Sequence, residues 1–301
     1  MRLRLGARGS PLSLAQASLV ARALSGKAEV EIVTIQTTGD RLAAAGSPIE
    51  WKGDFTRELD RALLDGRIDF AVHSLKDVPS AVPGGLVLAA VPPREDPSDV
   101  LVSHPRRRFG ELPAGARVGT SSPRRRAQLA AARPDLALSE ARGNVGTRLT
   151  QLREGRWDAI VLARAGLARL GRLEEICDVF PPEILLSAVG QGALALFTRS
   201  DDARTRELLG AIDHPESHLE ALAERSLLAA LEAGCHAPVA GRARAAGAQL
   251  TLDGGVFAAD GSRVLREAAC GPAGDPEAIG RSLAARLLAL GAADLLAGSP
   301  R

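Results

Sequence analysis

The sequence predicts an α/β protein in which two similar lobes precede a smaller α+β domain. Apolar runs that suit buried strands alternate with helical segments over the first two thirds of the chain, which is typical of α/β sheets. The pattern starts again after the proline-rich segment 92–97 and changes character near residue 215. The 301 residues are enough for two or three domains.

The first lobe is expected to begin with a strand at residues 2–6, where arginine and leucine alternate. A helix should follow, because Ser10 suits an N-cap, Pro11 the first helical position, and Gly26 the stop. A second helix is expected up to Leu64 with Asp54 as its cap, after a polar loop. We expect a parallel sheet whose further strands lie at residues 30–35, 68–74 and 86–91.

The second lobe is expected to repeat this arrangement. Residues 117–120 suit a strand, and Ser121-Ser122-Pro123 opens a helix as Ser10-Pro11 does. The run 64–69 is also echoed by residues 153–158, each being followed by apolar residues. Either an internal duplication or a chance similarity of βα units explains the repeat. In both cases two open sheets face a cleft with their strand ends, where such sheets bind ligands.

The last third predicts a small α+β domain of about 85 residues, within the usual range for a domain. An amphipathic helix is expected at residues 219–231, and a closing helix from Asp275-Pro276 to Leu290. Between them we expect short strands at residues 248–259 and 263–268, with hairpin turns at Asp253-Gly254 and Asp260-Gly261.

Composition argues against several classes of protein. Lys+Arg total 38 against 36 Asp+Glu, and aromatic residues make up 3 %, whereas nucleic-acid binders are usually more basic and use rings for stacking. The cysteines at 177, 235 and 270 form neither a disulfide framework nor a metal-ligand pattern. The N-terminus lacks the apolar stretch of a signal peptide, and no apolar run is long enough to span a membrane. We therefore expect a cytoplasmic protein.

Three loops combine glycine, hydroxyl groups and arginine where a helix begins, at residues 8–10, 119–126 and 142–148. Backbone N–H groups at a helix start bind anions, and neighbouring arginines strengthen such a site. Each loop alone is a weak signal, but three on one side of the sheets favour an anionic ligand. The loops lack a Walker lysine and a full dinucleotide fingerprint, so a nucleotide is not expected.

Two further features could carry chemistry. Lys76 and Asp77 follow directly on an apolar strand, where a cation beside a carboxylate can set the protonation of a ligand, although such pairs are usually solvated. Cys235 lies just beyond a helix, and a lone cysteine is more often a small buried hydrophobe than a reactive group.

The chain resembles the hydroxymethylbilane synthase (porphobilinogen deaminase) family over essentially its whole length. The matching runs, in order along the chain, are RGSPL at 8–12, KGDF at 52–55, AVHSLKDVP at 71–79, VGTSS at 118–122, RGNVGTR at 142–148, AGL at 165–167, AVGQG at 188–192, and Glu224-Arg225 leading to GCHAP at 234–238. So many motifs in one order make the resemblance specific.

The resemblance implies two periplasmic-binding-protein-like (type II) α/β lobes around a cleft, plus a small C-terminal α+β domain. Lobe 1 would comprise residues 1–93 and 193–212, lobe 2 residues 98–188, and the third domain residues 215–301. The chain would cross outward at residues 92–97 and return within 188–197.

The resemblance also implies an activity. The family joins four porphobilinogen molecules head to tail, releases ammonia each time, and yields the linear tetrapyrrole hydroxymethylbilane in porphyrin and haem biosynthesis. Its primer is a dipyrromethane cofactor held by a thioether. Carried over, Cys235 is the anchor and Asp77 the catalytic carboxylate. We expect a monomer, with neither a metal, a nucleic acid nor a membrane as partner.

The other site residues follow from the same resemblance. Porphobilinogen bears an acetate and a propionate, and arginine suits them because it stays protonated and binds carboxylates bidentately. The implied cofactor-binding residues besides Cys235 are Lys76, Asp77, Thr120, Ser121, Ser122, Arg124, Arg125 and Gly146. The implied substrate-binding residues are Arg8, Ser10, Phe55, Ser74, Arg142, Arg148, Arg169 and Gln191. Phe55 is expected to cover the pyrroles, and Arg126 and residues 106–108 to be solvated surface.

Two readings from other classes remain as alternatives. A binding protein with the same two-lobed fold would leave Asp77 and the Cys235 domain without a role. A nucleic-acid binder built on residues 106–108 and 124–126 is disfavoured by the near-neutral charge and the few aromatic residues.

Overall fold

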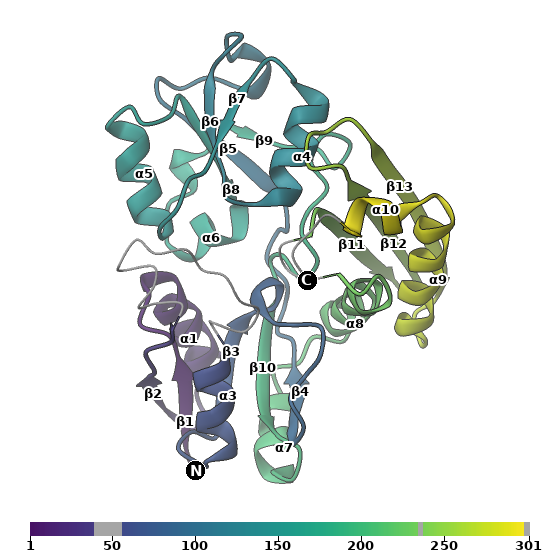
Figure 1. Ribbon diagram of the computed structural model, residues 1–301. Coiled ribbons are helices and arrows are strands. Elements are labelled where there is room, and N and C mark those ends of the chain that lie inside the picture. Colours follow the sequence, from purple (N-terminus) through teal and green to yellow (C-terminus); the bar gives the residue numbers. More distant parts are fainter. Residues whose placement is uncertain (39–55, 234–236, 298–301) are drawn as a thin grey trace.

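The computed structural model describes residues 1–38, 56–233 and 237–297. Two lobes, each built on a five-stranded sheet, lie one above the other, and a smaller domain on a three-stranded sheet lies beside them (Figure 1). The predicted fold class, two α/β lobes and a small C-terminal α+β domain, is therefore confirmed.

The sheet of the first lobe has the strand order β2-β1-β3-β10-β4. Strand β1 pairs in parallel with β2 and β3, but β10 is antiparallel to both of its neighbours. The four strands predicted for this lobe run in the same direction, but the sheet is not parallel throughout, because the chain leaves this lobe after β4 and re-enters it from the opposite direction as β10. The elements are β1 (Arg2–Ala7), α1 (Pro11–Ala23), β2 (Glu29–Thr34), α3 (Arg57–Leu64), β3 (Phe70–Ser74), η1 (Leu75–Asp77), β4 (Leu86–Ala90), β10 (Leu194–Arg199) and α7 (Ala203–Gly210).

The first two helices described in this lobe, α1 and α3, begin differently. Helix α1 starts as predicted, with the Ser10 hydroxyl accepting a hydrogen bond from Ser13 N at 3.2 Å. Helix α3 starts later than predicted, and its N-cap is Thr56, whose side chain makes no capping bond. The predicted cap, Asp54, lies outside the described residues.

The sheet of the second lobe has the order β7-β6-β8-β5-β9, in which β6 is parallel to its neighbours and β5 is antiparallel to both of its own. Side chains cap both long helices, since Ser122 accepts from Arg125 N and Asn144 from Thr147 N. The elements are β5 (Asp99–Ser103), η2 (Phe109–Glu111), β6 (Arg117–Gly119), α4 (Pro123–Ala132), β7 (Ala137–Ser139), α5 (Val145–Arg153), β8 (Ala159–Ala163), α6 (Arg164–Arg169), η3 (Leu173–Glu175) and β9 (Asp178–Val179).

The C-terminal domain packs helices against one face of an antiparallel meander. The predicted turn at Asp260-Gly261 joins two strands, but Asp253-Gly254 lies in the middle of a strand, so that turn prediction was wrong. A Cβ on Gly254 would lie 2.7 Å from Leu283 Cδ2, so glycine serves here for close packing of a helix. The elements are α8 (Pro215–Ala230), β11 (Val239–Ala246), β12 (Gln249–Phe257), β13 (Val264–Pro272), α9 (Pro276–Ala289) and α10 (Ala292–Ala297).

Two segments join the lobes, the outward crossing (residues 92–98) and the return crossing (residues 188–193). They touch backbone to backbone, since Glu95 N donates to Gly192 O at 3.2 Å. A Cβ on Gly192 would lie 2.1 Å from Glu95 O, and the φ of Gly192 is +87°. Only glycine fits both constraints.

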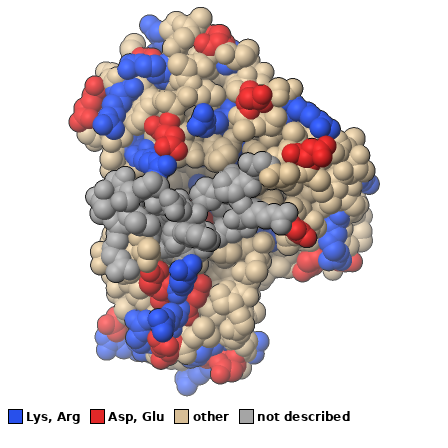
Figure 2. All heavy atoms as spheres, in the orientation of Figure 1, with Lys and Arg blue, Asp and Glu red and all other residues tan. Residues whose placement is uncertain are grey.

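Positive and negative side chains are interspersed over both lobes and the C-terminal domain on the face seen in Figure 2. Within the described ranges, no helix has the length and apolarity to cross a bilayer.

Candidate active site

Charged loops from both lobes meet beside the two crossings. On the first lobe, β3 ends in the turn Leu75–Asp77, which carries Lys76 and Asp77. On the second lobe, helix α4 carries Arg124 and Arg125 at its start. The charges interact across the lobes: Arg125 affects the pKa of Lys76, and Asp77 affects the pKa of Arg148 on α5. The structure therefore brings the predicted loops to one site.

Asp77 is exposed at the end of this turn, whereas Leu75 is buried beneath it. The turn is closed by Val78 N donating to Leu75 O at 3.1 Å, and Leu75 N donates to Ala193 O of the return crossing at 3.0 Å. A rigid backbone thus presents an accessible carboxylate, which is what contact with a ligand requires.

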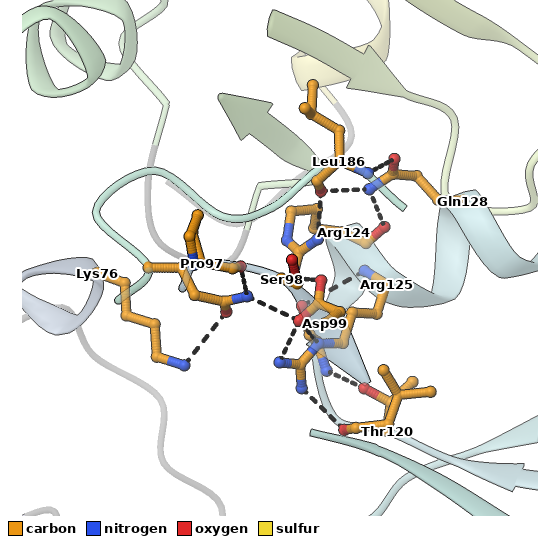
Figure 3. A network of polar contacts seen from close by, with 12 residues as sticks. Lys76, Pro97, Ser98, Asp99, Thr120, Arg124, Arg125, Gln128 and Leu186 are labelled. Carbon is orange, nitrogen blue, oxygen red and sulfur yellow. Dashed lines mark hydrogen bonds and ion pairs between the residues drawn. The ribbon is translucent and has the colours of Figure 1, made fainter. Parts of the chain in front are cut away.

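Lys76 is held in a partly desolvated place. Its Nζ lies 3.5 Å from Gln191 Oε1, at the outer limit of a hydrogen bond (Figure 3). Burial lowers the pKa of Lys76 to about 8, and nearby Arg125 acts in the same direction, while Asp77 opposes the change. The amine is therefore cationic at neutral pH but loses its proton more readily than an ordinary lysine.

Asp99, at the start of β5, is the centre of a buried network shown in Figure 3. Its carboxylate lies 2.7 Å from Arg124 Nη2 and 2.7 Å from Arg125 Nη2, and it accepts Gln191 Nε2 at 2.8 Å. Burial alone would raise the pKa of Asp99, but the two guanidinium groups outweigh burial and lower it. Asp99 is thus an ionised partner that fixes both arginines.

The same arginines have further fixed partners. Arg124 also donates to Leu186 O, and Arg125 Nη1 donates to Val161 O at 2.9 Å. Their side chains are 4 % and 7 % exposed. The structure therefore places both groups beneath the site surface, where they supply positive potential from fixed positions.

The other predicted arginines are more accessible. Arg142 is exposed and paired with Glu140 at 2.9 Å, whereas Arg148 is half-buried and donates to Gly143 O at 2.8 Å. Arg169 is half-buried and donates to Gly192 O of the return crossing. Burial lowers the pKa of both Arg148 and Arg169 to about 10, so both remain cationic at neutral pH.

Arg8, also half-buried, lies at the end of β1 on the first lobe. Its charge acts on β3, the strand that precedes the turn with Lys76 and Asp77: burial first and then the charge of Arg8 lower the pKa of His73 on β3 to about 4. Arg126, by contrast, is exposed on α4, as expected.

The predicted hydroxyl and glycine residues mostly shape the loops. Ser10 and Ser122 cap helices, and Ser121 Oγ donates to Ala141 O. Thr120 is fully buried, with its Oγ1 accepting from Ser122 N at 3.2 Å. Gly146 lies in the first turn of α5, where a Cβ would meet Asn144 Oδ1 at 3.4 Å.

Sequence reasoning missed two polar residues of this region. Asp99 went unnoticed although it is an acid at the head of an apolar run, shortly before the arginine-rich helix. Gln16 is a buried amide on α1 whose Nε2 donates to Ser74 Oγ at 2.7 Å, and it therefore orients that hydroxyl. The signal for Gln16 was a polar residue on the apolar face of a predicted helix.

Phe55 and Cys235 lie outside the described residues. Helix α8 ends at Ala230, and the described residues on either side of 234–236, Ala233 and Ala237, are 5 % and 6 % exposed in the core of the C-terminal domain.

A cavity of about 360 Å³ lies apart from these loops, between α3 and the segment after the turn Leu75–Asp77. His73 lines it, on the face of β3 opposite to Ser74, since side chains alternate along a strand. Its walls include Leu64, Val82 and Phe197.

Comparison with known proteins gives a consistent result. The family model "Porphobilinogen deaminase, dipyromethane cofactor binding domain" matches residues 3–207, and "Porphobilinogen deaminase, C-terminal domain" matches residues 218–289. Similar proteins include the porphobilinogen deaminase of Rubrobacter xylanophilus, 52 % identical over 297 residues that cover 98 % of this chain and 96 % of the relative. That of Moorella thermoacetica is 49 % identical over 299 residues, covering 98 % and 95 %.

Among solved structures, a nutrient binding protein from Burkholderia cenocepacia bound to methionine is similar with a TM-score of 0.44 and 14 % identity, over 71 % of this chain and 93 % of that one.

Proposed function

The chain belongs to the porphobilinogen deaminase family, and from this premise we propose that Asp77 is its catalytic carboxylate and that the cationic loops hold the carboxylates of cofactor and substrate. It is a transferase that joins four porphobilinogen molecules, with release of ammonia, into hydroxymethylbilane in porphyrin biosynthesis, starting from a dipyrromethane cofactor. The observation that carries the proposal is the accessible carboxylate of Asp77, whose charge acts on Lys76 of its own lobe and on Arg148 of the other lobe.

Asp77 acts on the proton balance of each condensation. The aminomethyl group of porphobilinogen leaves as ammonia after protonation, and its loss leaves a positive charge on the substrate pyrrole. A carboxylate beside the ring accepts the pyrrole N–H, offsets the developing charge, and takes up the proton that the newly joined ring releases. An exposed carboxylate at the end of a rigid turn has access to both protons.

The cationic groups match the chemistry of a dipyrromethane. Each pyrrole ring carries two carboxylates, and Lys76, Arg148 and Arg169 are cations whose partial burial strengthens an ion pair with them. The bound cofactor supplies the ring carbon to which the first substrate is joined. Arg124 and Arg125, fixed by Asp99, keep the surrounding potential positive without having to move.

The remaining assignments complete the proposal. Cys235 forms the thioether, and Phe55 covers the pyrroles; both lie outside the described residues. Besides Lys76, Asp77 and the two fixed arginines, the cofactor is bound by Thr120, Ser121, Ser122 and Gly146. Substrate is bound by Arg8, Ser10, Ser74, Arg142, Arg148, Arg169 and, acting through Lys76, Gln191.

The strand orders support lobe 1 at residues 1–93 and 193–212, lobe 2 at 98–188 and the third domain at 215–301. The proposal is completed by a cytoplasmic monomer that takes porphobilinogen and no nucleic acid.

The decisive variant for the catalytic role is Asp77→Asn. It keeps the shape of the side chain but removes the charge and the capacity to take up a proton, so turnover should fall by about 10²-fold or more with unchanged thermal unfolding. A matched control is Asp294→Asn, which neutralises a carboxylate with 81 % exposure on α10. Turnover of Asp77→Asn equal to that of the control would show that Asp77 is not the catalytic group.

Intact-protein mass spectrometry tests the cofactor and separates the enzyme from a binding protein of similar fold. Protein expressed in a host that makes porphobilinogen should exceed the chain mass by one dipyrromethane, and Cys235→Ser should have the bare chain mass. A bare mass for the unmodified chain would contradict the proposed anchor.

A further inference from the structure

The return crossing directly supports the turn Leu75–Asp77, which is called the catalytic turn below. The backbone of Gly190 lies against the turn, so that a Cβ built on it would be 2.9 Å from Lys76 N and 2.8 Å from Leu75 Cγ. Two residues farther along the crossing from Gln191, Ala193 O accepts the Leu75 N–H at 3.0 Å. The position of Lys76 and Asp77 therefore depends on where this crossing lies.

A single buried carboxylate of the C-terminal domain fixes the crossing. Glu224 on α8 is fully buried and accepts the N–H of Gly190 at 2.6 Å and of Ala243 at 2.7 Å. It also binds Arg94 of the outward crossing, with Nη1 at 2.7 Å and Nη2 at 3.1 Å. Four donors satisfy the carboxylate, and charge-assisted hydrogen bonds of this kind are strong.

Arg94 brings the two crossings together at this point. Its Nε donates to Gln191 O at 2.9 Å, next to the Gly190 amide that Glu224 holds. Helix α8 continues from Glu224 to Ala230, and Cys235 follows in the sequence. The carboxylate is thus a rigid link between the helix that precedes the proposed cofactor anchor and the backbone beneath Asp77.

We propose that Glu224 and Gly190 are positioning residues for the condensation. Glu224 holds the return crossing against the catalytic turn, and Gly190 sets the distance between the crossing and the turn that carries Lys76 and Asp77. Neither residue touches the reacting atoms. The inference rests on the proposed catalytic role of Asp77. Its physical basis is that small misplacements of a reacting group cost much more rate than stability.

Gly190→Ala tests the contact with the turn. Its matched control is Gly66→Ala: the φ values are +72° and +67°, so alanine is strained at both positions, but a Cβ on Gly66 meets nothing within 4 Å. We expect Gly190→Ala, loaded with cofactor as shown by its mass, to lose about tenfold or more in kcat while Gly66→Ala keeps it. Equal kcat values for the two variants would overturn the proposed role of Gly190.

Glu224→Gln tests the link to α8, and Glu220→Gln is its control. Both glutamates bind Arg94 and a β11 amide, Ala243 N or Ala245 N, but only Glu224 is bonded to the return crossing among the described contacts. Both variants should lose stability, whereas only Glu224→Gln should lower kcat and speed hydrogen exchange at the Leu75 amide. Equal kcat values and equal hydrogen-exchange rates in the two variants would refute the link. This test does not depend on Gly190→Ala and remains valid if that variant fails to fold.

The outcome for Asp77→Asn keeps the two proposals apart. If that variant turns over normally, the proposed function fails at Asp77. If it is inactive while Gly190→Ala and Glu224→Gln match their controls, Asp77 keeps its role and the positioning inference is wrong.

Discussion

Two pairs of charged residues at the site, one pair on each lobe, are held in opposite ways. On the second lobe, Arg124 and Arg125 are buried, and both are paired with Asp99. On the first lobe, Asp77 is exposed, and Lys76 Nζ lies 3.5 Å from Gln191 Oε1, at the outer limit of a hydrogen bond. Positive charge is thus fixed in advance, where reorganisation would cost rate, while Asp77, the proposed proton-exchanging group, stays accessible.

The difference follows from where each group lies relative to a strand. Asp99 is the first residue of β5, a strand with a neighbour on each side, and it is fully buried, so its carboxylate needs internal partners. Asp77 comes after the last residue of β3, in a turn that has already left the sheet.

The largest effect should come from Asp99→Ala. It leaves two buried guanidinium groups without their carboxylate, and breaking a buried ion pair typically costs about 3–5 kcal/mol of unfolding free energy. Denaturant unfolding measures the loss. Glu31→Ala, which breaks the exposed pair with Arg2, should cost at most about 1 kcal/mol. Similar costs for both variants would mean that the second lobe is no more preorganised than the surface.

Arg148→Leu should weaken ligand binding next. Loss of a hydrogen bond to a charged group costs about 1.5–3 kcal/mol, which is about a 10- to 150-fold loss in kcat/KM. The mixture of enzyme–intermediate complexes seen by mass spectrometry should shift as well. Arg126→Leu, an exposed position on α4, is the control. An unchanged mixture of enzyme–intermediate complexes in Arg148→Leu would show that this arginine does not bind the ligand.

The kcat/KM of the enzyme should depend on pH through Lys76 of the first lobe. Its pKa is lowered to about 8, so its charge is complete well below that pH and is lost as pH rises through it. Bound carboxylates raise the pKa of Lys76. The pH profile of kcat/KM should therefore have an alkaline limb, in which kcat/KM falls as pH rises, at or above pH 8. Lys76→Arg should move this limb upward, because arginine stays protonated. The same limb in both enzymes would assign it to another group.

The smallest effect should follow Glu140→Gln. Its pair with Arg142 has side chains 52 % and 49 % exposed, so stability should change by less than about 1 kcal/mol. Because the variant frees Arg142 for ligand carboxylates, KM for porphobilinogen should fall slightly. A rise in KM would indicate that Glu140 orients Arg142 instead of competing for it.

Local signals in the sequence predicted local structure well. Ser10-Pro11 and Ser122-Pro123 marked the starts of α1 and α4, because capping depends on a few neighbouring residues. The direction of β10 and the place of Gly254 could not be predicted in this way, since a returning chain and a packed helix determine them. These are contacts between residues far apart in the sequence.

The site followed the same division. The loops around Arg8, Asp77 and Arg142 were visible in the sequence as motifs. In the structure, charged loops of the two lobes meet at one site. The pairing of Asp99 with two arginines was not visible, because nothing in the local sequence tells which acid a buried arginine will meet. For Cys235, local composition favoured a buried apolar role, and the resemblance to a family alone suggested the thioether.

The contact at Gly192 has a mechanical consequence. The outward and return crossings touch at this point, so one crossing cannot be twisted about the other without separating Glu95 N from Gly192 O. A displacement of one lobe relative to the other that keeps this hydrogen bond therefore has to move both crossings together.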